Sequence, residues 1–444
     1  MGIKKQLLNG DNAIGVWGTG YIGYSTMASF AYNGVRCIGV DVLPGKVEAI
    51  NRGIVPVENL DKWLSFDVKP LVESGLIKAT TDWKELIRPD VAVHMIAIPT
   101  EKDGAPYDAI LEDVIRKIAD GIKNIVRESP PLVIIESTLT PGRSDRIIIP
   151  IFRKAGLSVG KDILLGVAPR RDWFISADKN LKNLPRIIGG TTPETTEMMK
   201  DVLSIVCDTL LPAPDHKHAE MIKSIENAFR HADITLANQL SLAYPNIDMK
   251  TVLKLVGTKW NIGTYHPSFG TGGYCIPLSS QYVLLGAEKP DELTILKSAI
   301  ETDSQQPIRV AESIISRGFR NIGILGLAYK GDLKVDILSP AVKIAKHLKE
   351  KGANVKVNDP YYSREEIQKI TGCENFDFPD GLHEFDCVLI VADHSLYRFT
   401  QNNVILSNMK NCRLVLDNTG IWGKVPFKES GIEYRVAGDK RWLI

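Results

Sequence analysis

A glycine-rich segment near the N-terminus has the residue types and spacing of a nucleotide-binding loop. Gly18-Thr19-Gly20-Tyr21-Ile22-Gly23 reads G-x-G-x-x-G between an expected strand and an expected helix. Such glycines permit a tight turn, close approach of a pyrophosphate and close helix–strand packing, and the helix N-terminus offers free N–H groups to phosphates. Asp41 ends the next expected strand, where a carboxylate accepts a hydrogen bond from a ribose 2′-hydroxyl and repels a 2′-phosphate. The pattern predicts NAD as the cofactor, and its alternative is an ordinary glycine-rich turn.

A lysine, an asparagine and a cysteine form a second candidate set. Lys223 and Asn227 lie four residues apart on a long expected helix and therefore share one face. Cys275 follows Gly272-Gly273, which suits a backbone folded tightly around a ligand. A nearby lysine and free backbone N–H groups lower the pKa of a thiol and favour the nucleophilic thiolate. From the residues alone, a solvated polar stripe and a buried structural cysteine remain open as alternatives.

Two α/β regions and a helical region are expected to position these residues. Short β-rich runs at 13–17, 35–41, 91–99, 132–136, 163–167 and 186–189 alternate with amphipathic stretches, which predicts a parallel sheet covered on both faces. A long helix is expected from the N-cap Asp215 to Ala243, before Pro245. A second α/β pattern starts near residue 306, with expected strands at 321–325, 355–358, 387–391 and 413–416 and a helix at 341–351.

The predicted fold class is therefore α/β, with two Rossmann-like parallel-sheet domains joined by a helical central domain that contains one long helix. We place the domains at residues 1–205, 206–305 and 306–444. Helices as long as 215–243 often bridge domains or subunits. Its apolar residues lie on more than one side, so we expect it to pack between domains and against a second copy of the chain.

The composition excludes several classes of function. Lys+Arg is 54 and Asp+Glu is 53, a balance that offers no bulk attraction to nucleic acid or to an anionic membrane. The N-terminus lacks the features of a signal peptide, and no apolar run reaches the roughly 18 residues of a membrane span. None of the six cysteines has CxxC spacing. We expect a cytoplasmic protein without a metal site and without a nucleic-acid or membrane partner.

In combination and order, these motifs resemble the UDP-glucose/GDP-mannose dehydrogenase family over almost the whole chain. The segment 219–240 is close to the family pattern AE-x-x-K-x-x-x-N, and 269–277 reads FGTGGYCIP. The other matching segments are the GxGYIG loop with Asp41, 98–100, 136–138 followed by 141–142, 184–190, 326–330, 339–340, 358–360, 392–394 and 416–417.

The resemblance implies oxidation of a CH2OH group to a carboxylate with two NAD per sugar. A first hydride leaves an aldehyde, a thiolate attacks it, a second hydride leaves a thioester, and water releases the uronate. Cys275 would be the nucleophile, Lys223 and Asn227 would stabilise oxyanion charge, and Thr138 would place the water or the nicotinamide. The implied cofactor-binding residues are Gly18, Gly20, Tyr21, Ile22, Gly23, Asp41, Pro99, Thr100, Thr138 and Lys330. The expected substrate-binding residues are Arg170, Phe269, Gly270, Gly272, Gly273 and Lys330.

Several positions depart from the family pattern. Arg170 stands where the family has a glutamate, Ser279 where it has an aspartate four residues after the cysteine, Ile337 where it has an arginine, and Gln239 where it has a glutamate. Arg170 and Arg171 would supply fixed positive charge to a substrate with an extra anionic group. In the other interpretation they pair with acids such as Asp172 or Asp178 and face solvent.

Three functions stay open at this point. The first is oxidation of a nucleotide sugar, with UDP favoured by family frequency and an acidic sugar as a variant substrate. The second is a catalytically altered or non-catalytic nucleotide-sugar-binding homologue, which the lost carboxylates favour. The third is a β-hydroxyacid or 6-phosphogluconate type of dehydrogenase, which predicts neither Cys275 nor a second α/β domain. In each case the expected assembly is a homodimer or a higher homo-oligomer.

Overall fold

The computed structural model describes residues 2–172 and 179–443. The chain forms two compact units. Unit 1 comprises Met1–Glu226 and Leu285–Glu288, and unit 2 comprises Asn227–Leu284 and Lys289–Ile444. The long helix α9 (His216–Ala243) contributes residues to both. Its bounds agree with the prediction, and the Asp215 carboxylate accepts a hydrogen bond from the His218 N–H at 3.0 Å, as an N-cap does.

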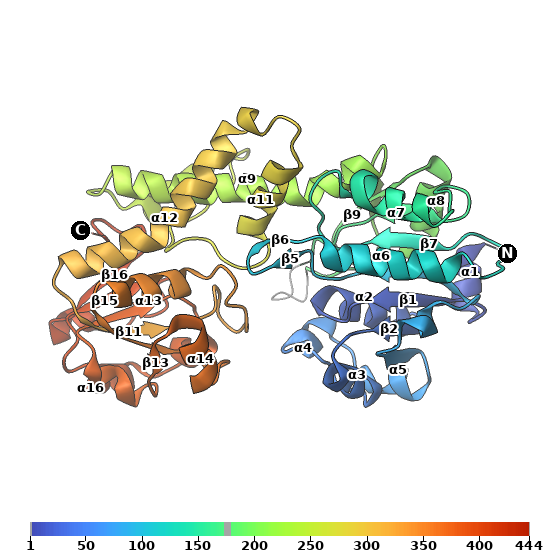
Figure 1. The fold of residues 1–444 in the computed structure, drawn as a ribbon. Helices are drawn as coiled ribbons and strands as arrows, with labels where there is room; N and C mark the ends of the chain where they lie inside the picture. The colour runs from blue at the N-terminus through green and yellow to red at the C-terminus, as the bar shows by residue number, and fades with distance from the viewer. Residues whose placement is uncertain (1, 173–178, 444) are drawn as a thin grey trace. The chain divides into compact units, whose positions relative to one another are not determined.

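Unit 1 contains an eight-stranded sheet in the order β10-β9-β8-β7-β4-β1-β2-β3 (Figure 1). The strands are β1 (Ala13–Trp17), β2 (Cys37–Val40), β3 (Ile77–Thr80), β4 (Val91–Ile96), β7 (Leu132–Ile135), β8 (Leu164–Val167), β9 (Arg186–Gly190) and β10 (Leu210–Pro212). Six of them, β3-β2-β1-β4-β7-β8, follow the doubly wound order, in which a ligand binds where the order reverses, between β1 and β4. The expectation of a parallel sheet is corrected at one edge, because β9 pairs antiparallel with β8.

Hydrophobic cores cover both faces of this sheet. Successive residues of β1 alternate between them: Ile14 packs in the core with α2 (Tyr21–Tyr32) and α8 (Pro193–Leu203), and Trp17 packs in the core with α6 (Ala109–Ile122) and α7 (Ile149–Lys154). This burial on both sides confirms the predicted sandwich of helices around the strands. The remaining helices of this part are α1 (Ile3–Leu8), α3 (Pro44–Asn51), α4 (Leu60–Leu64) and α5 (Lys69–Glu73).

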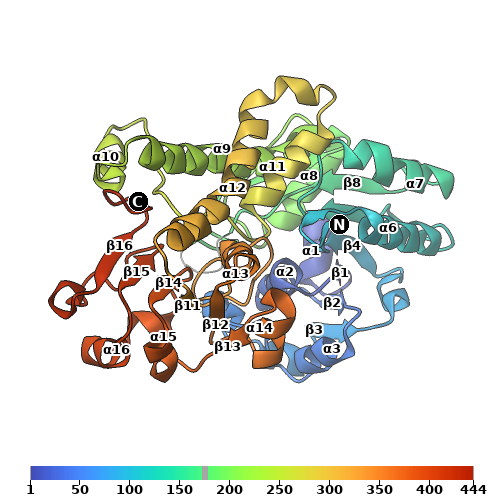
Figure 2. The ribbon, with the colours of Figure 1, turned by 60° about the vertical axis from the view of Figure 1, so that its left-hand side comes forward.

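Unit 2 contains a six-stranded parallel sheet in the order β13-β12-β11-β14-β15-β16 (Figure 2). Its strands are β11 (Asn321–Leu325), β12 (Asn354–Asn358), β13 (Glu374–Asn375), β14 (Cys387–Ile390), β15 (Leu414–Asp417) and β16 (Glu433–Val436). One face packs against α12 (Thr294–Ser316), α13 (Pro340–Glu350) and α14 (Arg364–Thr371), and the other against α15 (Ser395–Arg398) and α16 (Asn402–Asn408). The helices α10 (Met249–Val256) and α11 (Ile276–Gly286) complete the helical region.

The α/β fold class with two parallel-sheet regions and an intervening helical region is thus confirmed. The three-domain division stays a prediction, since the expected boundary at 305/306 falls inside α12 and the long helix belongs to both units. Among the described residues, no helix is long and apolar enough to span a membrane.

A buried histidine on β4 gives unit 1 a specific sensitivity to acid. His94 is fully buried, and its Nδ1 accepts a hydrogen bond from the Trp17 indole N–H at 3.3 Å. Burial, with the nearby charge of Arg127, lowers the pKa of His94 to about 3. The folded protein therefore keeps this imidazole neutral while the unfolded chain takes up a proton below its ordinary pKa of about 6.5.

We expect the stability contributed by neutral His94 to be present above pH 6.5 and lost progressively as pH falls toward 3. The unfolding free energy should then change by about 1.4 kcal/mol per pH unit, which is the value for the uptake of one proton. Urea unfolding of the wild type and of His94→Asn, which keeps an acceptor where Nδ1 lies, measures this slope. The variant should be less stable at neutral pH but flatter between pH 6 and 4, whereas the exposed His383→Gln should keep the wild-type slope. Equal slopes in His94→Asn and wild type would contradict the assignment.

Candidate active site

The loop after β1 has the shape of a cradle for a pyrophosphate. Gly18 has a φ of +84°, and a Cβ there would lie 2.5 Å from the Ala97 carbonyl oxygen. A Cβ on Gly23 would lie 1.9 Å from the Gly18 oxygen, so both positions exclude a side chain. A Cβ on Gly20 would meet no atom of the described residues within 4 Å. The protein's own packing therefore does not require the middle glycine, whereas close approach of a ligand at the N-terminus of α2 does.

Asp41 lies just after β2, beside this loop. Its Oδ2 accepts hydrogen bonds from the Thr19 N–H at 3.0 Å and the Thr19 hydroxyl at 2.8 Å, and Lys46 lies 3.2 Å away. Burial alone would raise the pKa of Asp41, but the Thr19 hydrogen bonds and the Lys46 charge outweigh burial and lower it. The carboxylate is thus held ionised where a ribose hydroxyl would donate. The sequence analysis did not identify Lys46 as the partner of this carboxylate. The available signal was a lysine shortly after the acidic residue.

Polar contacts join the loops after β4 and β7. The Thr100 hydroxyl donates to the Thr138 carbonyl at 2.7 Å, and the Ser137 hydroxyl bonds both the N–H and the carbonyl of Ile98 at 2.9 and 2.8 Å. The Gly18 contact with Ala97 brings the same segment to the cofactor loop. Pro99, Thr100 and Thr138 are therefore gathered at the switch point of the sheet, as a nicotinamide site requires.

The first part of α9 is tied to this region by a buried carboxylate. Glu220 accepts hydrogen bonds from the N–H groups of Arg143 at 2.8 Å and Ser144 at 3.3 Å. The Ser224 hydroxyl donates to the Leu139 carbonyl at 3.4 Å. Burial raises the pKa of Glu220, and the two amides oppose that rise. Lys223 is half-buried on this part of the helix, next to the residues that hold the Thr138 loop.

Arg170 points into the interior of unit 1. Only 4% of it is exposed, and its Nε donates to Asp172 Oδ2 at 2.7 Å. Its Nη1 donates to the Thr26 hydroxyl at 2.5 Å, and its Nη2 donates to the Ser25 hydroxyl at 3.1 Å, both on α2. The Thr26 hydroxyl donates in turn to Glu136 at 2.7 Å. Burial opposes the guanidinium charge, but Asp172 and Glu136 outweigh it and raise the pKa of Arg170.

This network neutralises the positive charge that we expected the protein to offer to an anionic substrate. Arg186 pairs with Glu136 at 2.5 Å, so two arginines face two carboxylates in the interior. Arg171 pairs with Glu226 at 2.6 Å and is partly exposed. The interpretation that both arginines pair with acids is confirmed for Arg170 and Asp172, but the idea that Arg170 faces solvent is wrong. Asp178, the other acid considered, lies outside the described residues. Substrate binding by Arg170 stays a prediction.

Cys275 lies immediately before α11 and is exposed, while the other five cysteines of the described chain are buried. Its carbonyl accepts the first helical hydrogen bond, from the Ser279 N–H at 3.1 Å. The thiol therefore lies at the N-terminus of α11. Asn227 Nδ2 donates to the Ser279 hydroxyl at 3.0 Å, and Asn227 Oδ1 accepts from Arg230 at 3.4 Å. The amide of Asn227 is thus oriented with its N–H groups toward the helix that begins at the cysteine.

The loop before Cys275 is anchored at almost every residue. The Ser268 N–H donates to Asn238 Oδ1 at 2.6 Å, and the Phe269 N–H donates to Asn418 Oδ1 at 2.8 Å. The Phe269 ring is buried and stacked on Trp442, with ring centroids 5.9 Å apart. Both the ring and the N–H of Phe269 are therefore engaged within the protein, and its contact with a substrate stays a prediction.

Three glycines of this loop are required by its shape. Gly270 has a φ of +129°, and a Cβ on Gly272 or Gly273 would come within 2.6 Å of the Tyr329 side chain. Lys330 follows Tyr329 in the turn after β11, so this tight packing places the glycines beside the predicted Lys330 segment.

The switch point of the second sheet differs chemically from that of the first. The N–H groups of Leu327 and Ala328, just after β11, donate to Asp359 Oδ2 at 2.8 and 3.1 Å. His394 Nε2, after β14, lies 3.0 Å from the same oxygen. These N–H groups donate to a carboxylate of the protein itself. At Gly20, in contrast, the space beside the backbone contains no atom of the described residues. The sequence motifs at 358–360 and 392–394 are thus explained as the two sides of one buried contact.

The predicted catalytic residues divide between the two units. Thr138 and Lys223 belong to unit 1, and Asn227 and Cys275 belong to unit 2. The structure brings Asn227 to the Cys275 helix through Ser279, and it brings Thr138 to the cofactor loops. Lys223 and Asn227 share a face of α9 through their spacing. Within the described part of the chain, no three His, Cys, Asp or Glu residues are arranged to hold a metal ion.

Known proteins match this chain along most of its length. Three models of the UDP-glucose/GDP-mannose dehydrogenase family match: the NAD binding domain at residues 12–206, the central domain at 217–305 and the UDP binding domain at 323–424. The chain is 29% identical over 436 residues to UDP-N-acetyl-D-mannosamine dehydrogenase of Methanocaldococcus jannaschii, covering 96% of each chain. It is 27% identical to the enzyme of that name from Escherichia coli, covering 92% of this chain and 99% of the relative.

Solved structures share the fold. The UDP-D-ManNAc dehydrogenase of Pyrococcus horikoshii superposes with a TM-score of 0.80 at 24% identity, covering 97% of this chain and 100% of that one. A UDP-glucose dehydrogenase of Pyrobaculum islandicum superposes with a TM-score of 0.82 at 24% identity, covering 96% and 97%. The matched NAD binding domain contains the cradle at Gly20 and the ionised Asp41, and the matched UDP binding domain contains the second sheet. With the three family models matched in order over residues 12–206, 217–305 and 323–424, this protein is a member of the UDP-glucose/GDP-mannose dehydrogenase family.

Proposed function

We propose that this NAD-dependent oxidoreductase converts the C6 alcohol of a UDP-linked sugar to the carboxylate through a thioester on Cys275. The observation that carries the proposal is the exposed Cys275 at the start of α11, directly after a loop shaped by Gly270, Gly272 and Gly273. Burial raises the pKa of other thiols, such as Cys412 to about 12, so those cysteines are held protonated.

In this proposal the cofactor and each site residue have separate roles. Bound NAD supplies the hydride acceptor for each of the two oxidations. The Cys275 sulfur attacks the aldehyde carbon, a C–S bond forms, and the carbonyl electron pair moves to oxygen. The amide N–H of Asn227 and the Lys223 ammonium stabilise that oxyanion, a contact typically worth about 3 kcal/mol. After loss of the second hydride, water attacks the thioester and the C–S bond breaks, so that the carboxylate and a proton are released and the Cys275 thiol is regenerated.

The departures from the family pattern affect the last step. With Arg170 turned inward and Ser279 bonded to Asn227, neither position offers a carboxylate as general base to the attacking water. A positioned general base typically contributes about 10²–10⁴-fold. We therefore propose that hydrolysis of the thioester is slow in this protein relative to its oxidation steps.

For the sugar, we propose an N-acetylated hexosamine. Seven relatives of this chain are named UDP-N-acetyl-D-mannosamine dehydrogenases. The preference for an acidic sugar loses its physical basis, since Asp172 and Glu136 neutralise Arg170. A panel of UDP-glucose, UDP-N-acetylglucosamine, UDP-N-acetylmannosamine and UDP-N-acetylmuramate, an acidic UDP-sugar that keeps its C6 alcohol, tests this with NAD, by NADH yield and product mass.

We expect two NADH per molecule of an N-acetylated UDP-hexosamine. Because the CH2 of the alcohol becomes C=O, the product should be about 14 Da heavier than the substrate. Turnover of UDP-N-acetylmuramate alone would support the acidic-sugar hypothesis. Tight binding of a UDP-sugar with no NADH release under any condition would instead support the non-catalytic homologue. The matched UDP binding domain removes the support for a β-hydroxyacid dehydrogenase.

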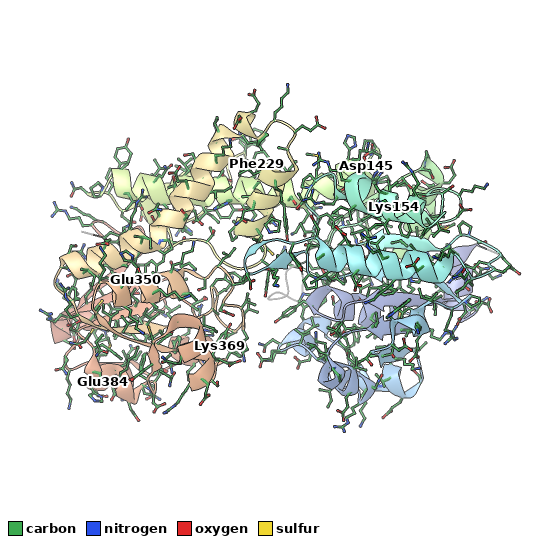
Figure 3. The ribbon with its side chains drawn as sticks, viewed as in Figure 1. Asp145, Lys154, Phe229, Glu350, Lys369 and Glu384 are labelled. Carbon is green, nitrogen blue, oxygen red and sulfur yellow. The ribbon has the colours of Figure 1, made fainter. Side chains whose placement is uncertain are left out.

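A homodimer through the helical region is the proposed assembly. Phe229, labelled in Figure 3, lies on α9. It is 70% exposed, and Leu236 on the same helix is 54% exposed. An apolar groove of about 510 Å³ lies between the later part of α9 and α10 and is lined by residues such as Leu240 and Val256. Exposed apolar surface of this kind marks interaction sites. Analytical ultracentrifugation at micromolar concentration should give at least a dimeric mass, and Phe229→Asp should shift it toward the monomer. A cytoplasmic location remains part of this proposal.

A further inference from the structure

A buried polar cluster behind the cysteine loop joins four segments of unit 2. His231 on α9, Ser280 on α11 and Asp303 on α12 are 1%, 0% and 6% exposed. His231 Nδ1 lies 2.8 Å from the Ser280 hydroxyl oxygen, and His231 Nε2 lies 3.2 Å from Asp303 Oδ2. The fourth segment is the cysteine loop itself, through Thr271. We call these four residues the His231 anchor.

The anchor holds the cysteine loop through a single carboxylate. Asp303 Oδ1 accepts from the Thr271 N–H at 3.0 Å, and Oδ2 accepts from the Thr271 hydroxyl at 2.5 Å. Both carboxylate oxygens therefore bind the residue between Gly270 and Gly272. Those glycines have no side chains with which to fix the loop, so the Thr271 contacts supply orientation that the glycines cannot.

His231 stabilises this arrangement of a carboxylate in a buried setting. An ionised carboxylate out of water is costly unless hydrogen bonds satisfy it. Burial would raise the pKa of Asp303, but the His231 imidazole at 3.2 Å and the hydrogen bonds from Thr271 outweigh burial and lower it. On its other side His231 contacts Ser280, one residue beyond the Ser279 that bonds Asn227. The same imidazole thus fixes both the loop before Cys275 and the helix after it.

We propose that His231 is a positioning residue for Cys275, which acts through Asp303 and Thr271 on one side of the thiol and through Ser280 on the other. It is too deeply buried to touch a substrate, so it has no catalytic contact of its own. The inference rests on the proposed function in taking Cys275 as the nucleophile. A displacement of about 1 Å at a reacting atom can cost about 10²-fold in rate, which sets the expected effect.

Three substitutions separate the two contacts of the imidazole. His231→Leu removes both. His231→Gln keeps an amide donor near the Nε2 position and so preserves the polar contact with Asp303. His231→Asn keeps a polar atom near the Nδ1 position and so preserves only the Ser280 side. His347→Leu is the matched control, because it breaks another histidine–carboxylate pair of unit 2, with Glu312 at 2.6 Å, that belongs to α13 and α12 and not to the anchor.

Two readouts are measured on the full-length protein, kcat against KM on the best nucleotide sugar and the rate of Cys275 alkylation by iodoacetamide without substrate. His231→Leu should lower kcat about 10²-fold and change the alkylation rate, with the Kd for NAD unchanged. His231→Gln should restore most of kcat, and His231→Asn should not. His347→Leu should lose stability only. Equal behaviour of His231→Leu and His347→Leu, with normal kcat and alkylation, would overturn the proposal.

Two further outcomes keep the test decisive. If His231→Leu does not fold, Thr271→Val removes one bond to Asp303 at constant volume, and it should reproduce the change in kcat and alkylation in smaller degree. An unchanged kcat and alkylation rate in that variant would reject the anchor. If Cys275 proves not to be the nucleophile, activity fails as a readout, but the alkylation rate still reports whether His231 positions the thiol.

Discussion

Replacing Cys275 with alanine is expected to abolish carboxylate formation and to leave the affinity for NAD nearly unchanged. Without the sulfur, no thioester can form, and loss of a covalent nucleophile typically costs about 10⁴-fold or more in kcat. The NAD cradle around Gly20 belongs to the other unit, so the cofactor site keeps its contacts. The measurement is product mass and NADH yield on the best nucleotide sugar, together with calorimetric titration of NAD.

A matched control is Cys373→Ala, which removes a buried thiol from the same unit. It should lower stability, as a cavity does, without changing the product. A uronate made at the normal rate by Cys275→Ala would refute the thioester mechanism. Accumulation of an aldehyde with one NADH per sugar would instead be consistent with it, because only the steps after the first oxidation need the thiol.

The second large effect is expected from Arg170→Glu, and it is an effect on stability. The substitution removes the cation that faces Asp172 and Glu136 and adds a third carboxylate in the same buried space. Breaking a buried ion pair by removing one partner typically costs about 3–5 kcal/mol, and the added charge raises that cost. We expect a loss of at least about 3 kcal/mol in the unfolding free energy of unit 1. Weaker NAD binding should follow, since Arg170 also holds Ser25 and Thr26 on α2.

The neighbouring arginine provides the control for this prediction. Arg171→Glu breaks a partly exposed pair with Glu226, for which a loss near 1 kcal/mol is typical. Chemical denaturation of both variants, with a comparison of kcat/KM across neutral and acidic UDP-sugars, gives the two outcomes. A stable Arg170→Glu protein with altered preference among substrates would show that Arg170 reaches the sugar, against its orientation in the structure.

Local pattern was sufficient for the elements whose identity depends on neighbours in the chain. The bounds of β1 and β11 follow from short apolar runs before glycine, and those of α9 follow from its periodicity, the N-cap Asp215 and the stop before Pro245. The short strands β3 and β10 escaped notice, since three or four residues carry too little pattern. The antiparallel pairing of β9 also escaped notice, because the direction of a strand depends on the path of its connection and not on its residues.

The sequence by itself predicted the cofactor, and its resemblance to the dehydrogenase family implied Cys275 as the candidate nucleophile. G-x-G-x-x-G with Asp41 describes a local turn and its partner strand, and the glycine pair before Cys275 describes a local loop. Such features depend on residues that lie close together in the chain, where the backbone geometry directly constrains the residue type.

Only the tertiary structure decided what surrounds those residues. Arg170 was expected to offer charge to a substrate, but Asp172, Glu136 and two hydroxyls of α2 turn it inward and neutralise it. The same is true of His231, whose position in the sequence resembles any polar residue of a helix until Asp303 and Ser280 close around it. A charge acts through its distance to other charges and through its exclusion from water, and both quantities arise only when segments remote in the chain pack together.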